Sequence, residues 1–514
     1  MNPKPLTFPL SFILKFHLNT AHGTLKTTKM GKSKLKPKEL YLLKTKGSFD
    51  IAAICREANI ILRSQSVTKG ELLQYIINAV DTPEVIDTDN RFKTLTQYLK
   101  AKNITSVDSK SNELHGEVSL HKPIGYTIYG ADGIEPGAIE QMENAMSLPV
   151  TLAGSLMADA HEGYGLPIGG VLATTGNVII PYAVGVDIAC RMCMSVFPIK
   201  PEILGTKSEM LSQILLRTTI FGLGSKNKNH IDTSLFDKKE WSATKVIKQL
   251  RDLAYSQLGT SGGGNHFVEW GELHITEFDP LLGFEPGKYL ALLSHSGSRG
   301  FGSEIALYYS KLAMEKVKLP GKARHLAWLD LNSQEGQEYW LAMNLAGEYA
   351  SANHHEIHAK VARELNVRPI RMIENHHNFA WFESLPDGRK AIVHRKGATP
   401  AHPNSLGIIP GSMVHPAFVI KGKGNPASLS SASHGAGRKM SRSKALQTFT
   451  QADLNYILEK WGVELIGAGL DEVPMAYKDI DAVMAYQSDL VGVLAKFYPK
   501  IVRMANPERK HRWE

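Results

Sequence analysis

The sequence predicts an α+β fold, because helical patterns and short glycine-punctuated apolar runs alternate along it without a regular strand–helix rhythm. Its 514 residues are 43% hydrophobic and 21% charged, which is typical of a globular protein. Residues 51–62 repeat apolar side chains near the helical period. The runs Gly169–Thr174 and Val178–Val186 indicate strands joined by tight turns. These features favour an α+β body over a doubly wound sheet.

Residues 1–49 form a basic leader that we expect to be disordered. They hold ten lysines and one acid, Glu39, so this segment alone accounts for the formal charge of +9. The apolar run Leu10–Leu14 ends at Lys15 and is far shorter than the about 20 residues of a membrane span. We therefore predict no membrane span and no signal peptide, and consider Met30 a plausible alternative start.

Residues 50–116 are predicted to form a helical N-terminal segment, and residues 117–514 the main body of the protein. Glycine-rich strands dominate the body to about residue 200, and turns and strands return over residues 367–425. The sequence shows no internal repeat, P-loop or dinucleotide-binding fingerprint. Helices are expected in the body at Glu304–Val317, Gln337–Glu364, Gln451–Trp461 and Ile480–Phe497.

The chain has three cysteines, Cys55, Cys190 and Cys193, too few for a disulfide framework. We therefore expect the protein in a reducing compartment, namely the cytoplasm. Cys190 and Cys193 form a single CxxC pair, whereas a zinc ribbon needs two. Their surroundings resemble a strand, so Cys190 is expected to point into a site and Cys193 into the core or the opposite face.

Several potential metal ligands lie next to glycines or turn-forming residues, where side chains can converge. A thiolate, imidazoles and carboxylates together suit zinc, manganese, cobalt or iron better than magnesium or calcium. Any one of the histidines, taken alone, is more often a hydrogen-bonded core residue than a ligand. The candidates are Asp159, His161, Asp187, Cys190, His266, His295, His376 and His377.

Three later segments offer glycine-containing or exposed backbone, and two of them add cationic side chains, which is how loops hold phosphate without a P-loop. They are Val393–Ala401, Ile409–Met413 and Ser431–Ala445. In the third, an imidazole at His434 could attack a phosphoryl group while nearby arginines neutralise the developing charge. An anion-binding turn with a structural histidine is an equally good interpretation from these residues alone.

Nine short motifs between Leu148 and Met484 resemble, in order, those of the RtcB-type RNA ligases. Each is weak alone, but nine in sequence are very specific. They are DAHEGYGLPIGG, GVDIAC, GGGNHFVE, HSGSRG, HHN, HRKGATPA, IPGSM, SHGAGRKMSR and AYK.

The resemblance implies a single large α+β domain with mixed sheets around a metal-lined cleft and helical insertions. It implies a GTP- and manganese-dependent enzyme that joins RNA 3′-phosphate or 2′,3′-cyclic phosphate ends to 5′-hydroxyl ends, in RNA repair or tRNA splicing. His434 would carry the guanylate. Two Mn²⁺ ions, bridged by Cys190, would be held by Asp187, Cys190, His266, His295 and His377.

The same resemblance assigns further contacts by motif position. Lys478 would reach the guanine. The guanylate would also contact Asn265, Glu269, Ser412, Ala436 and Gly437. Phosphates or RNA would be held by Arg395, Lys396, Arg438 and Arg442.

The chain departs from the family pattern at several positions and so resembles a divergent member. Glycine is common after the metal cysteine, but Arg191 stands there, and His415 lies among the substitutions after GSM. Because Arg191 could disturb nucleotide capture, a metal-dependent RNA end-processing phosphohydrolase without ligation is an alternative. A catalytically idle RNA-binding protein is a third hypothesis, supported only by the basic leader.

Overall fold

The computed structural model describes residues 51–63, a few isolated positions between 35 and 95, and residues 118–507 except 229, 230 and 232. Contacts divide the chain into one unit of residues 1–114 and another of residues 115–514. In the first unit, helix α2 (Ile51–Arg63) buries Ile54 and Ala58 and exposes Ile60. The predicted helix at 51–62 is confirmed, whereas nearly all of the predicted leader lies outside the described residues.

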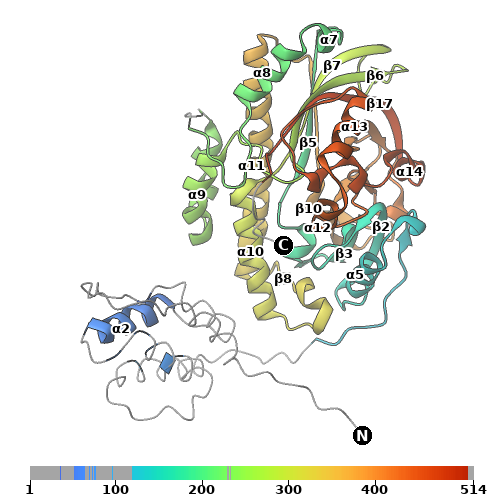
Figure 1. Ribbon diagram of the computed structural model, residues 1–514. Helices are drawn as coiled ribbons and strands as arrows, with labels where there is room; N and C mark the ends of the chain where they lie inside the picture. Colours follow the sequence, from blue (N-terminus) through green and yellow to red (C-terminus); the bar gives the residue numbers. More distant parts are fainter. Residues whose placement is uncertain are drawn as a thin grey trace. The chain divides into compact units, whose positions relative to one another are not determined.

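The largest sheet of the second unit brings together strands from distant parts of the chain (Figure 1). Its strands follow the order β13 (Leu406–Ile409), β14 (Ala417–Gly422), β17 (Val491–Met504), β6 (Phe267–Ile275), β7 (Gly287–Ser296), β5 (Arg191–Phe197) and β9 (Arg371–His376), with β16 (Glu464–Ile466) beside β17. The pairs along this path are antiparallel. Strands β6, β7, β5 and β9 are neighbours in this sheet, so residues that are far apart in sequence meet at one edge of the sheet.

A second sheet has five strands and carries another part of the site. Its order is β1 (Thr127–Ile128), β2 (Thr151–His161), β3 (Ile168–Thr175), β11 (Lys390–Lys396) and β10 (Asn378–Ser384). Two short ribbons pair β12 (Ala398–Pro400) with β15 (Ser431–Ser433), and β4 (Val178–Ile179) with β8 (Leu329–Asp330).

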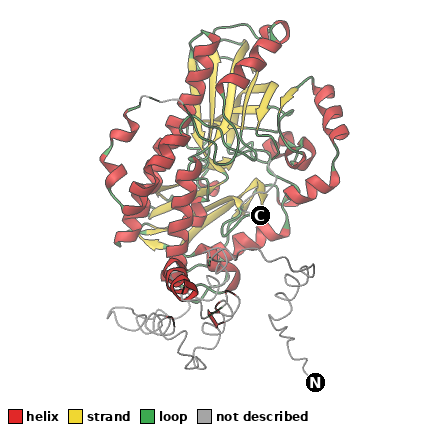
Figure 2. Cartoon of the chain, turned by 60° about the vertical axis from the view of Figure 1, so that its left-hand side comes forward, coloured by secondary structure: helices red, strands yellow, loops and turns green. Residues whose placement is uncertain are grey.

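Helices cover the sheets, and the longest, α11 (Gln334–Leu365), packs against β5 and β7 (Figure 2). The Ser333 side chain caps its start by accepting from the Gly336 amide, and Asn366, in the left-handed conformation, ends it. No helix among the described residues is long and apolar enough to cross a bilayer. The other helices are α5 (Pro136–Met146), α6 (Pro181–Val184), α7 (Ile203–Thr206), α8 (Ser208–Thr218), α9 (Lys245–Gln257), α10 (Arg299–Lys316), α12 (Arg442–Thr448), α13 (Gln451–Trp461) and α14 (Ile480–Ala485).

The predicted α+β fold with mixed sheets is confirmed, as are the helices expected near α10, α11 and α13 and the strand at β3. The strand expected over Val178–Val186 is wrong after Ile179, because Pro181 occupies the first turn of α6, where proline is favoured. The helix expected over Ile480–Phe497 ends at Ala485. Strand β17 follows, because its residues from Val491 alternate between buried and less buried and pair with β6 and β14.

Candidate active site

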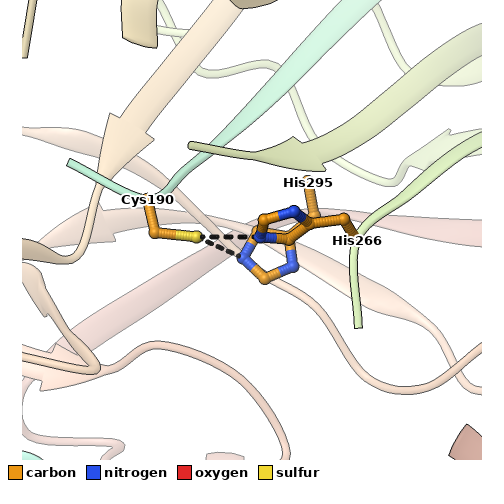
Figure 3. A group of neighbouring side chains, drawn as sticks. All are labelled: Cys190, His266 and His295. Atoms are coloured by element: carbon orange, nitrogen blue, oxygen red, sulfur yellow. Dashed lines mark hydrogen bonds between the residues drawn. The ribbon is translucent and has the colours of Figure 1, made fainter. Parts of the chain in front are cut away.

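Three predicted metal ligands meet at one edge of the large sheet. Cys190 directly precedes β5, His266 directly precedes β6, and His295 is the last but one residue of β7. The Cys190 Sγ lies 3.1 Å from the Nε2 atom of His295 and 3.5 Å from that of His266 (Figure 3). All three side chains are buried, and their ligand atoms are close enough to hold one ion.

The remaining two predicted ligands extend this group. Asp187 Oδ2 lies 3.2 Å from His266 Nε2, and His377 Nε2 lies 3.4 Å from His295 Nε2. His377 directly follows β9, and its amide donates to the Cys190 carbonyl, which ties the two segments together. We call Asp187, Cys190, His266, His295 and His377 the ligand cluster.

Main-chain carbonyls orient two of the imidazoles. His266 Nδ1 lies 3.0 Å from the Ser261 carbonyl, and His295 Nδ1 lies 3.2 Å from the Asn265 carbonyl. We assign the ring proton to each Nδ1 atom, which leaves both Nε2 lone pairs directed into the cluster. The buried Nδ1 atom of His377 has no hydrogen-bond partner among the described residues.

The electrostatics of the cluster suit a bound cation. Burial lowers the pKa of His295 to about 3 and that of His377 well below its usual value, so both rings are neutral at pH 7. Burial, with the nearby negative charge of Asp187, raises the pKa of the Cys190 thiol. A divalent cation would reverse that shift by releasing the thiol proton. Neutral imidazoles, one thiol and one carboxylate fit transition-metal binding.

His434 lies beside the cluster and is oriented by a buried carboxylate. It follows β15, and its Nδ1 atom is 2.6 Å from Asp159 Oδ2 in β2. The same oxygen accepts from the amides of His434 and Gly435 at 3.0 and 3.1 Å. Burial alone would raise the pKa of Asp159. The interactions with His434 and the positive charge of Lys478 outweigh burial and hold this pKa below its usual value, so Asp159 is ionised. We therefore place the His434 proton on Nδ1, leaving Nε2 as the nucleophilic atom.

The ring centroid of His434 is 4.9 Å from that of His377, which brings this imidazole to the ligand cluster. The turn that follows depends on Gly437, whose φ is +72° and whose place allows no Cβ, since that atom would lie 2.1 Å from the Asp159 carbonyl oxygen. Asp159 and His161 were candidate metal ligands. The structure instead directs the Asp159 carboxylate to His434, and His161 Nδ1 to the Asp159 carbonyl at 3.0 Å.

Sequence comparison identifies the family of the chain. The family model described as "tRNA-splicing ligase RtcB" matches residues 141–254 and 237–505. The chain belongs to the RtcB family. It is 34% identical over 394 residues to the RNA-splicing ligase RtcB of Escherichia coli strain K12, covering 70% of this chain and 92% of the relative.

Relatives from the other domains of life are similarly close. The tRNA-splicing ligase RtcB of Methanococcus maripaludis is 32% identical over 443 residues, covering 72% of this chain and 91% of the relative. The RNA-splicing ligase RtcB homolog 1 of Entamoeba dispar is 30% identical over 497 residues, covering 84% and 92%.

Some residues that the RtcB resemblance assigns to the nucleotide lie close to His434 or the ligand cluster. Lys478 Nζ donates to the carbonyls of Ala158 and Ala160, on either side of Asp159. The Asn265 carbonyl faces His295. Glu269, in β6, is 4% exposed, and burial raises its pKa well above the usual value. These contacts leave the nucleotide roles as predictions.

The remaining residues assigned to the guanylate lie in two turns. Ser412 Oγ lies 2.8 Å from Nδ1 of His415, one of the departures from the family pattern. Ala436 is 3% exposed and directly precedes Gly437 in the turn after His434. The guanylate contacts of these residues stay predictions.

The two arginines after His434 are paired with carboxylates. Arg438 donates to Glu472 at 3.2 Å and to the Asp471 carbonyl at 2.8 Å. Arg442 pairs with Asp471 at 2.8 Å and also with Glu472. Arg442 also lies beside Gly264, two residues before His266. To contact phosphate as predicted, each guanidinium would have to bind the phosphate beside its carboxylate partner or in place of it.

The segment Val393–Ala401 was interpreted as an exposed phosphate loop, and this is wrong for its first half. Residues through Lys396 form β11, whose backbone pairs with β3 and β10. Arg395 is fully buried and donates to Glu383, Ser431 and the Leu429 carbonyl. Lys396 donates to main-chain carbonyls of residues 164 and 166. A phosphate role for Arg395 and Lys396 stays a prediction.

Arg191 does not point into the ligand cluster. Its guanidinium pairs with Glu374 of β9 at 2.8 Å and donates to the Gly347 carbonyl of α11 at 3.3 Å. Strand geometry explains this, since Arg191 and Cys193 share the face of β5 that α11 covers. The expectation that this arginine lies beside the metal site therefore needs correction.

Two further residues support the cluster and were not singled out from the sequence. Arg299 Nη1 donates to the Ser261 carbonyl at 2.6 Å, lies 2.9 Å from His266 Nδ1, and its charge helps to lower the Asp187 pKa. Asn378 donates to the Asp187 carbonyl at 3.1 Å and accepts from the Gly397 amide at 2.7 Å. Both lie inside the quoted motifs HSGSRG and HHN, which were the available signal.

Proposed function

We propose that this RtcB-family chain joins RNA ends through a guanylate carried on His434, with GTP as donor and two Mn²⁺ ions in the ligand cluster. The chain is an RNA ligase, as its family and its relatives indicate. One observation carries the finer proposal: His434 is oriented by ionised Asp159 and stands 4.9 Å from the ring of a cluster histidine.

In the first step, His434 Nε2 attacks the α-phosphorus of GTP. A nitrogen–phosphorus bond forms, the bond to the β-phosphate oxygen breaks, and pyrophosphate leaves with its electron pair. Asp159 keeps the Nδ1 proton in place and stabilises the positive charge that develops on the ring. The resulting phosphoramidate is reactive enough to give the guanylate up again.

In the second step, an oxygen of the RNA 3′-phosphate attacks the guanylate phosphorus and His434 Nε2 leaves with the bond's electrons. In the third, an RNA 5′-hydroxyl attacks the activated 3′-phosphorus, its proton passes to solvent, and GMP departs. A 2′,3′-cyclic phosphate is hydrolysed by water at its bond to the 2′-oxygen, which gives the 3′-phosphate needed before the second step. The nucleotide in these steps would lie against Lys478 and the other predicted contact residues.

The ligand cluster fits a pair of divalent ions because it offers two carboxylate oxygens, three imidazoles and a thiol close together, with Asp187 as the partly exposed member. When bound, the ions would neutralise charge on the phosphoryl oxygens. Cys190 would hold the ions together with His266 and His295, because its Sγ atom lies 3.5 and 3.1 Å from their Nε2 atoms. The chain's own residues orient these donors through Ser261, Asn265 and Asn378.

The alternative of a phosphohydrolase that does not ligate rested on Arg191 disturbing nucleotide capture. Because this guanidinium pairs with Glu374 and Gly347, that argument loses its basis. We place the ligase in the cytoplasm, where a reducing environment keeps the Cys190 thiol available.

The test uses GTP labelled at the α-phosphate, Mn²⁺ and the full chain. The wild type should acquire an acid-labile covalent label and join a 3′-phosphate RNA to a 5′-hydroxyl RNA, whereas His434→Ala should do neither. His274→Ala is a matched control, since His274 lies at the far end of β6 and pairs with Glu272. Labelling that persists in His434→Ala would refute the carrier assignment, and cyclic-phosphate opening without any joined product would favour the hydrolase.

A further inference from the structure

A second group of thiol and imidazole side chains lies on the other face of the same strands. Cys193, His354 and His358 are all buried, and one ligand atom from each lies within 4.8 Å of the others. None of the three belongs to the ligand cluster or to the residues that the proposed ligase reaction uses. We call them the helix cluster.

The fold brings this group together from one strand and one helix. Cys193 lies in β5, where it pairs with Ser294 of β7. His354 and His358 are four residues apart on α11, so they share the helix face that packs against β5 and β7. The thiol therefore faces two imidazoles that stand one helical turn apart.

Serine hydroxyls orient both rings. Ser294 Oγ is 2.7 Å from His354 Nδ1 and 2.8 Å from His358 Nε2, and Ser195 Oγ is 2.8 Å from His358 Nδ1. A hydrogen bond to one ring nitrogen fixes the orientation of an imidazole, as it does for histidines that bind metal.

One polar atom in this group is unsatisfied. His354 is fully buried, yet its Nε2 atom has no hydrogen-bond partner among the described residues. A buried polar atom without a partner costs roughly 1–3 kcal/mol, and such atoms are rare in native proteins. Burial also keeps both rings neutral, lowering the pKa of His358 to about 3 and that of His354 well below its usual value, although the Ser296 main chain opposes the shift at His354.

We propose that Cys193, His354 and His358 bind one thiolate-preferring divalent ion of the Zn²⁺ type, which fastens α11 to the sheet. Each imidazole supplies one ring nitrogen, and because both nitrogens of His358 contact serine hydroxyls, the ion replaces one of those two contacts. The thiol supplies sulfur after transferring its proton to solvent as the ion enters. A fourth, oxygen ligand comes from the Ser294 hydroxyl or a water molecule. A thiolate with two imidazoles is a donor set that proteins use for zinc.

The role is structural because the group is closed to solvent and lies between a helix and a sheet. The proposal does not depend on guanylation of His434. It predicts that the chain binds an ion even when the ligand cluster has lost its thiol.

The test isolates the helix cluster in the full chain by using Cys190→Ser as the parent. Co²⁺ added to the metal-free parent should give a sulfur-to-cobalt charge-transfer band that saturates at about one ion per chain. Cys190→Ser/Cys193→Ser should lose the band, whereas the matched control Cys190→Ser/Cys55→Ser should keep it. A parent without the band, or a band that survives in Cys190→Ser/Cys193→Ser, would overturn the proposal.

A second measurement covers the case in which the Cys193 variant does not fold. Zn²⁺ should raise the thermal unfolding temperature of the Cys190→Ser parent, because an ion that binds only the folded state stabilises it. The rise should be lost in Cys190→Ser/His354→Gln, which keeps every thiol of the parent. An equal rise in both proteins would contradict the site, and so would its absence from the parent.

Discussion

The ligand cluster and the helix cluster share strands and ligand chemistry but differ in what surrounds them. On β7, the consecutive residues Ser294 and His295 face opposite ways, one to each cluster. Cys190 and Cys193 divide in the same manner around the start of β5. A sheet can therefore carry two groups of similar donors on opposite faces.

Access to solvent and to a nucleophile separates the two groups. In the ligand cluster the Asp187 side chain is 29% exposed, and His434 beside it is 15% exposed. In the helix cluster Cys193 and His354 are fully buried between the sheet and α11. Similar donors thus suit reaction with an incoming substrate at one place and attachment of a helix at the other. The difference predicts separate effects on activity and on stability.

The largest effect is expected from Cys190→Ser. Loss of this sulfur, which we propose as a metal ligand, should weaken ion binding to the ligand cluster and slow guanylation by more than about 100-fold, the upper end for residues that only support a metal ligand. Unfolding temperature should change little, whereas Cys193→Ser should lower it clearly. Mass spectrometry measures the metal content of each variant, single-turnover labelling the rate of guanylation, and thermal unfolding the stability. Normal labelling of His434 in Cys190→Ser would contradict this separation of activity from stability.

Asp159→Asn should come next in size. The amide cannot stabilise the charge that develops on His434, so the rate of guanylation should fall by about 10²–10⁴-fold. Glu162→Gln is the control, since this exposed carboxylate lies in the same motif. The maximal rate should fall with little change in the GTP concentration at half saturation. An equal loss in both variants would mean that Asp159 does not act through His434.

The sequence located the ligand cluster because its members lie in glycine-rich turns within recognisable motifs. The contacts of Cys190 with His266 and His295 confirm that these residues converge. Their convergence could not be derived from spacing alone, because it depends on strand order, which places β5 between β7 and β9. The partner of His434 was missed for the same reason, since Asp159 lies on the other sheet.

The helix cluster was not predicted because its members sit inside regular elements. His354 and His358 belong to a segment whose pattern predicts a helix, and nothing in that pattern says which face meets Cys193. Likewise Arg395 looks like a phosphate-binding residue in sequence, yet β11 buries it against Glu383. Short apolar runs such as Val491–Met504 are equally compatible with helix and strand until their pairing is known.

A smaller effect is expected for the ion pair between Arg191 and Glu374, which lies on the same face of the sheet as the helix cluster. Arg191 is 6% exposed and Glu374 30%, so removal of one partner leaves a partly buried charge. Arg191→Gln should lower the unfolding free energy by about 2 kcal/mol, less than a fully buried pair would show. Labelling of His434 per folded molecule should persist.

A double-mutant cycle sharpens this point. If the pair is direct, Glu374→Gln combined with Arg191→Gln should cost less than the sum of the two single changes. Urea unfolding of the four proteins measures the coupling. Additive losses would show that Arg191 acts through the Gly347 carbonyl of α11 instead.

An effect that appears only as the pH is lowered concerns His394, a buried histidine that belongs to neither cluster. Its Nε2 accepts from the Ile180 amide at 2.9 Å, and its Nδ1 lies 3.2 Å from the Leu172 carbonyl. Both ring nitrogens are thus satisfied by main chain, unlike those of His354. Burial lowers its pKa from 6.5 to about 4, although its carbonyl partners oppose that shift.

Between those two pKa values the unfolded chain binds a proton at this residue and the folded chain does not. Stability should therefore fall as pH is lowered through this window, by up to about 3 kcal/mol from His394. Urea unfolding at pH 7 and pH 4.5 should show a smaller loss in His394→Gln than in the wild type. His394 binds no metal, so this difference in stability should be the same with and without chelator. Protonation of the histidines in the two clusters, in contrast, should change when a chelator removes the metal. A difference that chelation abolishes would place His394 with the metal-binding histidines.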